Sequence, residues 1–428
     1  IGKKRFDKRV DEYDLETIQK IGETQIPYTF PINRIPKGDK TADPYSVGIT
    51  HIHHFYTKRN LFMFSKLLDL AKKSDLKRAV YFLITSFIVK TGSKLHNIGF
   101  KKGNINLAGA VPNTLFIPSS VAERNIIILA KNKLSYIKKA LSFQKEWGNY
   151  LIQALSSGNL AYHPDNSIEY IFIDPPFGGN LMYSELNFLW EAWLGVFTNS
   201  KSEAIINREQ KKKLFEYQTL MEECLKEFYR LLKPGHFLTI EFHNTQNVVW
   251  NAIQEALLHA HFVIADIRTL DKKQGTFNQM TTTGAVKQDL IISAYKPSSK
   301  FEQEFAIKGG TIQGAWDFIH QHLEQLPMPN KVGGRIEIQS ERTQYLLYDR
   351  MLAFHLVRGL TIPLSASEFY QGLSKGSFLM REGMVFTIPQ AHEYDQLRLS
   401  ADGVQQLSLF VTDEASAVQW LRGQLDKE

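Results

Sequence analysis

The stretch "YIFIDPPFGGNLMYSELN", residues 170–187, combines residue types that could bind an amino group. An apolar run ends in the carboxylate of Asp174, and Pro175, Pro176 and the aromatic ring of Phe177 follow it. Proline fixes φ and lacks a backbone N–H, so the two proline carbonyls are expected to point outward in fixed directions as hydrogen-bond acceptors. Acceptors beside a flat aromatic face match the exocyclic amino group of a nucleobase.

Such an amine is a poor nucleophile, because its lone pair is delocalised into the ring. Hydrogen bonds from its N–H groups to Asp174 and to the Pro175 carbonyl would localise the lone pair for attack on an electrophilic methyl group. The base cannot react inside a duplex, so it must be flipped out and stacked, most simply on Phe177. The alternative for a bare Asp-Pro-Pro triplet is a proline-rich turn with a capping aspartate, and the buried strand before it favours the catalytic interpretation.

Alternating strands and helices from about residue 148 predict the sheet that positions this motif. Ser167–Ile173 is a continuous apolar run, as expected of a parallel strand buried on both faces. Ligands of such sheets bind beyond the carboxyl ends of the strands, where Asp174 should lie. The other predicted elements are a strand and edge loop at Asn149–Ser157, helices at Gln218–Pro234 and Asn247–Ala260, a strand at His236–Asn244, and an antiparallel edge pair at His261–Leu270 and Lys287–Pro297.

Helices predominate before this sheet, and a mixed segment follows it. The predicted elements are helices at Lys58–Ser74, Leu76–Leu95 (packed on both sides) and Ala122–Phe143 (with Lys131, Lys133, Lys138 and Lys139 on a basic outer face), and a loop with the short strand "TLFIP" in Gly99–Ser120. The predicted domains are a linker or the end of an upstream insertion (1–60), a mainly helical segment packing on the core (61–147), the catalytic half (148–297) and a C-terminal accessory domain (301–428).

Composition limits the classes of function. The 428 residues are 43% hydrophobic and 22% charged, which is typical of a globular protein, and the net charge of +7 weakly favours a polyanionic partner. A single cysteine, Cys224, excludes an internal disulfide and a multi-thiolate zinc site, and it fits a reducing, cytoplasmic location. No apolar run approaches the roughly 20 residues of a membrane span, so no membrane partner is predicted.

A second group of candidate residues is the histidine-rich stretch "HIHHFY", residues 51–56. Three histidines in four residues could bind a metal ion. No cysteine or carboxylate stands nearby in the sequence, so a polar turn is the favoured interpretation and no metal site is predicted.

Three segments, "NSIEYIFIDPPFGGNLMYSELNFLWEAWL", "ECLKEFYRLLKPGHF" and "VKQDLIISAYKP", resemble a bacterial and archaeal family of large site-specific DNA amino-methyltransferases. The flanking segments "GITHIHHFYTKRNL" and "YLLYDRMLAFHLVRG", with the tail "QLSLFVTDEASAVQWLR", are similar to it as well, so the resemblance covers nearly the whole chain. It implies methylation of adenine N6 or cytosine N4 from S-adenosyl-L-methionine, with Asp174–Phe177 binding the target amine and base. Asn180, Tyr183 and Glu185 become candidate substrate-binding residues, and packing on Trp190 is the alternative for Tyr183.

The resemblance also implies a glycine-rich cofactor loop of the form F-x-G-x-G, in which tight glycine turns let the backbone approach the cofactor. The sequence contains no such loop after a convincing strand, so we expect the C-terminal portion of a methyltransferase that begins inside a longer protein. Thr57 and Lys58 are the candidate cofactor-binding residues of this portion. Lys58 and Arg59 could equally meet DNA phosphates or remain solvated.

Together these observations predict an α/β fold, with a partial doubly wound Rossmann-like methyltransferase sheet, an N-terminal helical segment and a C-terminal α+β unit. The predicted activity is DNA methylation, at adenine N6 rather than cytosine N4, in a restriction-modification or defence system. The predicted partners are DNA and either the missing N-terminal half or a restriction or defence subunit. Two alternatives stay open: an RNA adenine methyltransferase, and a non-catalytic DNA-binding or assembly subunit that lacks the cofactor half.

Overall fold

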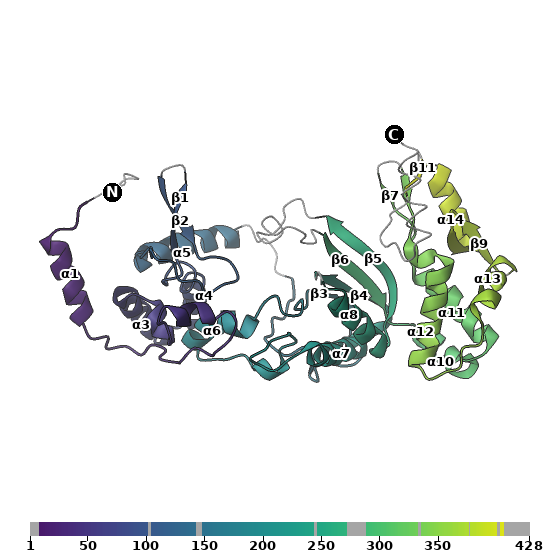
Figure 1. Cartoon of the computed structure of the whole chain (residues 1–428), viewed down its shortest axis with the longest axis horizontal. Helices are drawn as coiled ribbons and strands as arrows, with labels where there is room; N and C mark the ends of the chain where they lie inside the picture. The colour runs from purple at the N-terminus through teal and green to yellow at the C-terminus, as the bar shows by residue number, and fades with distance from the viewer. Residues whose placement is uncertain are drawn as a thin grey trace. The chain divides into compact units, whose positions relative to one another are not determined.

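The computed structural model describes residues 8–101, 104–142, 148–243, 246–271, 288–332, 335–375, 377–399 and 403–405. Residue contacts divide the chain into two compact units. Figure 1 labels their helices and strands. Unit 1 comprises Ile1–Gln153, Leu181–Glu203 and Asn207–Lys211, and unit 2 comprises Ala154–Asn180, Ala204–Ile206 and Lys212–Glu428. The four-part domain division remains a prediction.

Unit 1 is mainly helical. Its elements are α1 (Glu12–Glu23), α2 (Ala42–Ser46), η1 (Ile52–Phe55), α3 (Lys58–Lys72), α4 (Lys77–Thr85), β1 (Asn97–Lys101), β2 (Asn104–Gly109), α5 (Ile126–Ser142), α6 (Tyr183–Leu194) and η2 (Ser200–Ser202). Thr57 caps α3 by accepting the backbone N–H of Asn60. The core includes Phe55, Phe64 and Trp193.

Two predictions for unit 1 are wrong. The helix expected at Leu76–Leu95 ends at Thr85, and its Phe82 is 64% exposed rather than packed. The chain then turns, which brings Phe87 into the core. The expected strand "TLFIP" is irregular, and an antiparallel hairpin of β1 and β2 precedes it.

The predicted sheet is the centre of unit 2. Its elements are β3 (Ile168–Ile173), α7 (Leu214–Leu231), β4 (Leu232–Phe242), α8 (Asn247–His259), β5 (Val263–Asp271) and β6 (Gln288–Tyr295). The strand order is β3-β4-β6-β5, with β3 parallel to β4 and the other two pairs antiparallel. This arrangement confirms the α/β fold with a partial mixed sheet, and it confirms the antiparallel pair, in which β5 forms the edge.

The boundaries of two elements differ from the predicted ones. Helix α7 begins at Leu214 rather than Gln218, and the "KPG" sequence expected to end it lies within β4. Gly235 adopts a left-handed conformation (φ +79°) there and donates its N–H to the Lys296 carbonyl at 2.8 Å. Residues 149–157 form no strand, contrary to the prediction.

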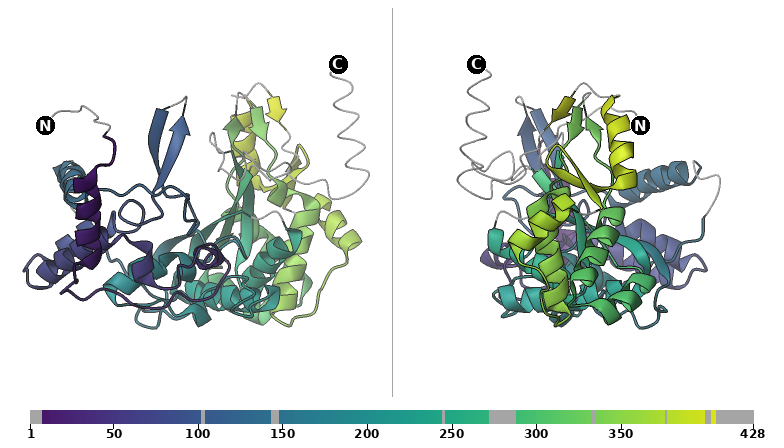
Figure 2. Two further views of the ribbon diagram at one scale, coloured as in Figure 1. Left: turned by 60° about the vertical axis from the view of Figure 1, so that its left-hand side comes forward. Right: turned by 90° about the vertical axis from the view of Figure 1, so that its right-hand side faces the viewer.

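The two faces of the sheet differ. Helices α7 and α8 lie on one face of the sheet (Figures 1 and 2). Ile171, Leu238 and Ile240 belong to the buried cluster that contains residues of these helices. On the opposite face of β3, Tyr170 is 56% exposed and Phe172 is 54% exposed. The prediction that this strand is buried on both faces is therefore wrong, because in the described part of the chain Tyr170 and Phe172 of β3 remain exposed.

The rest of unit 2 mixes helices and short strands, as predicted. Its elements are α10 (Ser299–Lys308), α11 (Ile312–Gln325), β7 (Lys331–Val332), β8 (Arg335–Glu337), η3 (Ser340–Arg342), α12 (Gln344–Val357), α13 (Ala366–Lys375), β9 (Phe378–Arg381), β10 (Met384–Thr387), α14 (Ile388–Leu399) and β11 (Gly403–Gln405). Fully buried Arg342 joins them by donating to the carbonyls of Leu326, Pro327 and Val385. Burial lowers the pKa of Arg342 to about 10.

Candidate active site at the end of strand β3

The segment before β3 is fixed to the corner between α7 and β4. Arg230 donates to the carbonyls of His163 (2.9 Å) and Leu160 (3.0 Å) and pairs with Asp165 at 2.6 Å. The Nζ of Lys296 donates to the side chain of Asn166 at 2.7 Å and to the Leu232 carbonyl at 2.9 Å, which ties the segment before β3 to the start of β4. These contacts hold β3 in place beside β4 and thereby set the position of the residues that follow it.

Asp174 lies directly after the last residue of β3, at the carboxyl end of the strand, and it is exposed. Pro175 is buried beside it, and Pro176 is half-buried. The described part of the chain places no donor on the Pro175 carbonyl. An exposed carboxylate and a carbonyl of restricted direction therefore stand next to each other at the edge of the sheet.

The Pro176 carbonyl does not point outward as expected. It accepts a hydrogen bond of 2.8 Å from the hydroxyl of Tyr217, which is fully buried on α7. Burial raises the pKa of Tyr217 well above its usual value, so the phenol remains a proton donor. The prediction that both proline carbonyls face a substrate is thus wrong for Pro176, whose carbonyl fixes the turn.

The turn continues through two glycines. Gly178 is buried in a left-handed conformation (φ +72°), and its carbonyl accepts the N–H of Ile206 at 3.2 Å. A Cβ atom at Gly179 would lie 3.2 Å from the Ile206 carbonyl oxygen. The loop after Phe177 therefore packs tightly on residues 204–206, and glycine permits this geometry.

Phe177 packs on residues at the end of the neighbouring strand. Its ring meets that of Phe242 edge-on, at 5.4 Å and 81°, and lies 6.2 Å from the ring of His243. The side chain is half-buried, so part of its surface is exposed. Stacking of a flipped base on this ring remains a prediction.

His243 is a site residue that the sequence analysis missed. It follows β4 directly, and its Nδ1 lies 2.7 Å from Oδ1 of Asp289, which is buried near the start of β6. Because β6 is antiparallel to β4, its first residues lie at the same edge of the sheet as the last residues of β4. A polar residue directly after a parallel strand, as in "EFHN", was the signal that could have identified His243.

The predicted substrate residues fall in both units. Asn180 is exposed at the end of a unit 2 segment, whereas Tyr183 (40% exposed) and Glu185 begin α6 in unit 1. The Glu185 carboxylate is buried and accepts the backbone N–H of Lys40 (2.7 Å) and the side-chain amide of Asn207 (3.1 Å). Its observed contacts are thus structural.

The two candidate cofactor residues also make structural contacts, all within unit 1. Thr57 caps α3 and donates its hydroxyl to Glu123 at 2.6 Å. The Nζ of Lys58 donates to the Gly22 carbonyl at 2.8 Å. Neither contact identifies a cofactor site.

The histidine stretch forms a compact aromatic group. His51, His53 and His54 lie in or beside η1, and their ring centroids are 4.4 to 5.7 Å apart. Burial lowers the pKa of His53 and of His54, which favours the neutral form of both rings. Within the described ranges, no three or more His, Cys, Asp or Glu side chains are grouped in a way that could hold a metal ion.

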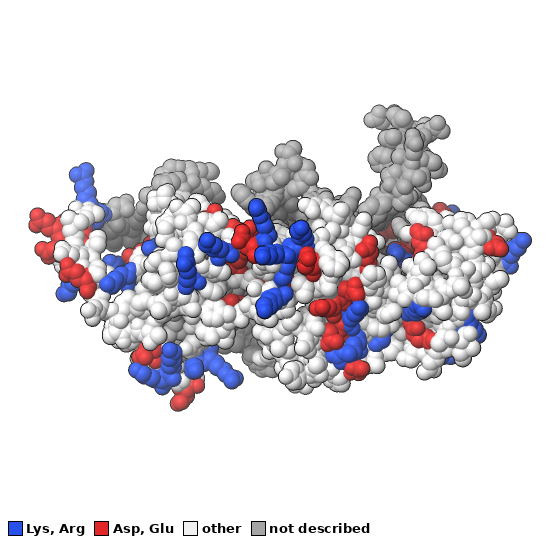
Figure 3. Space-filling view, turned by 60° about the horizontal axis from the view of Figure 1, so that its bottom comes forward, with Lys and Arg blue, Asp and Glu red and all other residues white. Residues whose placement is uncertain are grey.

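The predicted basic face of α5 is largely exposed. Lys131, Lys138 and Lys139 are exposed on α5, and Lys133 is half-buried, in agreement with a basic outer face. Figure 3 shows Lys and Arg on one face in separate groups with Asp and Glu among them. None of the helices in the part of the chain that the structure covers has the length and apolarity needed to cross a membrane.

A family model described as DNA methylase matches residues 168–346, from β3 into α12. This match includes Asp174 and supports a DNA methyltransferase, without distinguishing adenine N6 from cytosine N4. No curated protein matches the chain.

Among solved structures, the chain is similar to an S-adenosylmethionine-dependent methyltransferase from Methanosarcina mazei (12% identity, 40% of this chain and 78% of that chain, TM-score 0.23). It is also similar to a protein from Thermus thermophilus assigned as a DNA modification methylase, in complex with S-adenosyl-L-methionine (16% identity, 40% of this chain and 68% of that chain, TM-score 0.20).

Proposed function

We propose that the chain is the amine-binding part of an S-adenosyl-L-methionine-dependent DNA methyltransferase that acts on a flipped base, adenine N6 in preference to cytosine N4. The observation that carries this proposal is the exposed Asp174 at the carboxyl end of β3, next to the Pro175 carbonyl. The family match over residues 168–346 supports the same reaction class. A role in restriction-modification or defence is part of the proposal.

In this proposal the chain positions the amino group. Asp174 and the Pro175 carbonyl accept its two N–H groups, which localises the lone pair on nitrogen. Tyr217 holds the turn through the Pro176 carbonyl, which fixes the backbone that carries both acceptors. The cofactor, when bound, supplies an electrophilic methyl group.

The two candidate cofactor residues make contacts within unit 1: Thr57 caps α3 and binds Glu123, and Lys58 donates to the Gly22 carbonyl. We therefore propose that a further segment or subunit with the glycine-rich loop completes the enzyme. The exposed side chains of Tyr170 and Phe172 on β3 support this, because a doubly wound sheet is covered on both faces.

The test is methyl transfer from radiolabelled S-adenosyl-L-methionine by the native enzyme, with duplex DNA and structured RNA as competing acceptors. Digestion of the product to nucleosides and mass spectrometry then identify the methylated base. The proposal expects N6-methyladenine in DNA. Methylation of RNA but not of DNA would contradict the proposal and support an RNA adenine methyltransferase.

A non-catalytic subunit is the second candidate, and the engagement of Thr57 and Lys58 favours it. Calorimetric titration of this chain with S-adenosyl-L-methionine, alone and with the rest of the native enzyme, separates the two. Binding that appears only in the complete enzyme, together with methyl transfer, supports the catalytic proposal. Absence of transfer from the complete enzyme would favour the second candidate.

A further inference from the structure

A histidine and a carboxylate meet at the carboxyl end of β4, and the proposed reaction gives them no role. Strands β4 and β6 are antiparallel, and Phe242 pairs with Leu290, so the residues next to this pair, one on each strand, lie opposite each other. These residues are His243 and Asp289, and Nδ1 of His243 lies 2.7 Å from Oδ1 of Asp289. A ring proton on Nδ1 makes so short a contact favourable, whereas two lone pairs would repel each other. We therefore assign the ring proton to Nδ1, which leaves Nε2 as the acceptor of the neutral ring.

The pair is buried on the carboxylate side and partly accessible on the imidazole side. The Asp289 side chain is 4% exposed, whereas the His243 side chain is 20% exposed. Nδ1 itself is inaccessible to solvent, so the exposed part of His243 belongs to other atoms of the side chain. The N–H direction at Nδ1 is not well aligned with the carboxylate, which is common in catalytic pairs before the substrate binds. A buried carboxylate thus orients an imidazole ring that is partly accessible from outside.

This pair lies at the same edge of the sheet as Asp174 and Phe177. Asp174 follows the last residue of β3 and His243 follows the last residue of β4, and adjacent strands are about 4.8 Å apart. The ring of Phe177 lies 6.2 Å from the ring of His243. A base that stacks on Phe177 would therefore have the His243 ring beside it.

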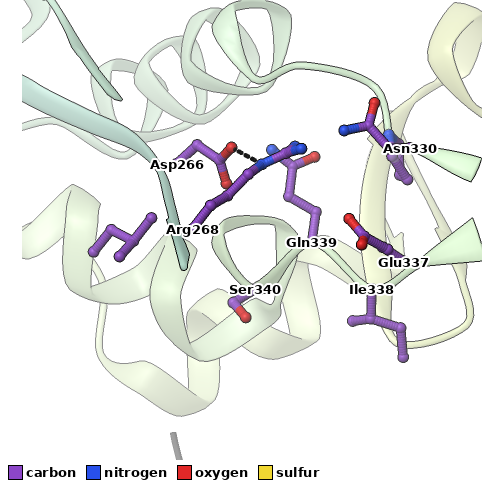
Figure 4. Close-up of a pocket in the computed structure, with 9 residues that line it drawn as sticks. Asp266, Arg268, Asn330, Glu337, Ile338, Gln339 and Ser340 are labelled. Atoms are coloured by element: carbon purple, nitrogen blue, oxygen red, sulfur yellow. Dashed lines mark hydrogen bonds and ion pairs between the residues drawn. The ribbon is translucent and has the colours of Figure 1, made fainter. Parts of the chain in front are cut away.

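A second acid–base pair on the same sheet, Asp266 and Arg268 of β5, has no room for a substrate (Figure 4). The pocket that these two residues line with Gln339 has a volume of about 20 Å³, which admits about one water molecule. The Nε of Arg268 donates to the Asp266 carboxylate, and an arginine stays protonated, so it accepts no proton. Of the two pairs, only His243 and Asp289 can meet a substrate.

We propose, on the basis of the proposed function, that Nε2 of His243 accepts the proton that the target amine loses when it is methylated. As the amine nitrogen bonds the methyl carbon of the sulfonium donor, the carbon–sulfur electron pair remains on sulfur and the nitrogen becomes positively charged. The nitrogen then releases one proton to Nε2, and the Asp289 carboxylate stabilises the imidazolium until water removes the proton. An imidazole is a stronger base than a carboxylate, so Asp174 orients the amine while His243 takes the proton.

The test compares single-turnover methyl transfer to duplex DNA by the native enzyme and its variants at saturating S-adenosyl-L-methionine. His243→Ala removes the proton acceptor, and Asp289→Asn removes the negative charge behind it with little change of shape. His236→Ala is the matched control, because His236 is half-buried on the same strand, away from its carboxyl end. Fluorescence anisotropy measures the DNA affinity of each variant, and circular dichroism checks its fold.

We expect His243→Ala to lower the rate by about 100-fold without a change in DNA affinity, because the proton moves only during the reaction. Asp289→Asn should lower the rate by about ten-fold or more, since the imidazolium loses its counter-charge. Added imidazole should restore part of the rate of His243→Ala and should not affect His236→Ala. Such rescue requires a folded site and identifies a missing base, which a purely structural role of His243 would not produce.

A wild-type rate in His243→Ala, or a slow rate that imidazole does not restore, would overturn the role of His243. A wild-type rate in Asp289→Asn would overturn the role of Asp289. If the wild-type enzyme transfers no methyl group, the proposed function fails and the role of His243 fails with it. Equal rates of transfer by the wild type and by His243→Ala refute only the role of His243.

Discussion

The hydroxyl of Tyr217 is the contact that gives the Asp-Pro-Pro-Phe turn its fixed geometry. We predict that Tyr217→Phe lowers the free energy of unfolding by about 1 kcal/mol, because the Pro176 carbonyl loses its donor. The rate of methyl transfer should fall more than the KM for DNA rises, since the turn positions the amine in the transition state. Urea denaturation and steady-state kinetics measure the two effects.

Tyr162→Phe is the control, because Tyr162 is 89% exposed in the same unit. It should leave stability and kinetics unchanged. If Tyr217→Phe behaves like this control, the hydrogen bond to Pro176 does not organise the turn.

At the residue scale the sequence predicted the position of Asp174 but not the contacts around it. A carboxylate directly after an apolar strand is a local pattern, and it predicts where the side chain lies. Tyr217 stood just outside the predicted helix, and its contact with Pro176 joins residues 41 positions apart. Such a contact depends on how α7 packs on the sheet. A pattern of neighbouring residues in the sequence does not predict this packing.

At the scale of elements, Lys296 joins the end of α7 to the sheet. Its Nζ donates to the carbonyls of Tyr229 and Leu232 and to Asn166, and it lies 4.7 Å from the centre of the Tyr229 ring. We predict that Lys296→Met lowers the free energy of unfolding by about 1–3 kcal/mol, because the last carbonyls of α7 lose their donor. Urea denaturation monitored by circular dichroism measures the change.

Lys300→Met, which alters an 87% exposed side chain on α10, should change stability by less than about 0.5 kcal/mol. If both substitutions change the free energy of unfolding equally, the hydrogen bonds from Lys296 to the end of α7 do not stabilise the fold.

Helices with a clear apolar face, such as α3 and α8, could be predicted from periodicity, and so could the strands β3, β4, β5 and β6. The hairpin of β1 and β2 and the early end of α4 could not. The apolar run at Leu76–Leu95 has no periodic polar positions, so a helix and a helix followed by buried turns give the same pattern. Exposure of one face of β3 depends on which other elements pack on the strand. A continuous apolar run in the sequence does not predict this packing.

At the scale of the whole molecule, His322 makes stability depend on pH. It is fully buried on α11, where its Nδ1 and the hydroxyl of Tyr295 on β6 form a hydrogen bond of 2.9 Å. Burial lowers the pKa of His322 to about 3. The unfolded chain takes up this proton near pH 6.5, whereas the folded chain does not, so acidification below about pH 6.5 favours unfolding.

Between pH 7.5 and 5.5 this single proton should remove about 1.4 kcal/mol from the free energy of unfolding. Urea denaturation at both pH values measures it, and His322→Gln should lose this part of the pH dependence. If the variant has the same pH dependence as the wild type, His322 has the same pKa in the folded and the unfolded chain, which would contradict the prediction.

The α/β fold and the mixed sheet of unit 2 could be predicted, because the strands and helices of this sheet have their own periodicity and their order selects the fold. The division into two units could not, since unit 1 takes its last segments from residues 181–211, after the Asp-Pro-Pro-Phe turn. The order of elements along the chain does not show that these segments return to unit 1 after a segment of unit 2.

The most direct test of the account is methyl transfer by the native enzyme carrying Asp174→Ala. Asp174 is exposed, so the variant should fold like the wild type, with unchanged circular dichroism and thermal unfolding. The account predicts that transfer of labelled methyl groups to duplex DNA falls by at least about 100-fold. Transfer at the wild-type rate would contradict the assignment of Asp174 to the target amine.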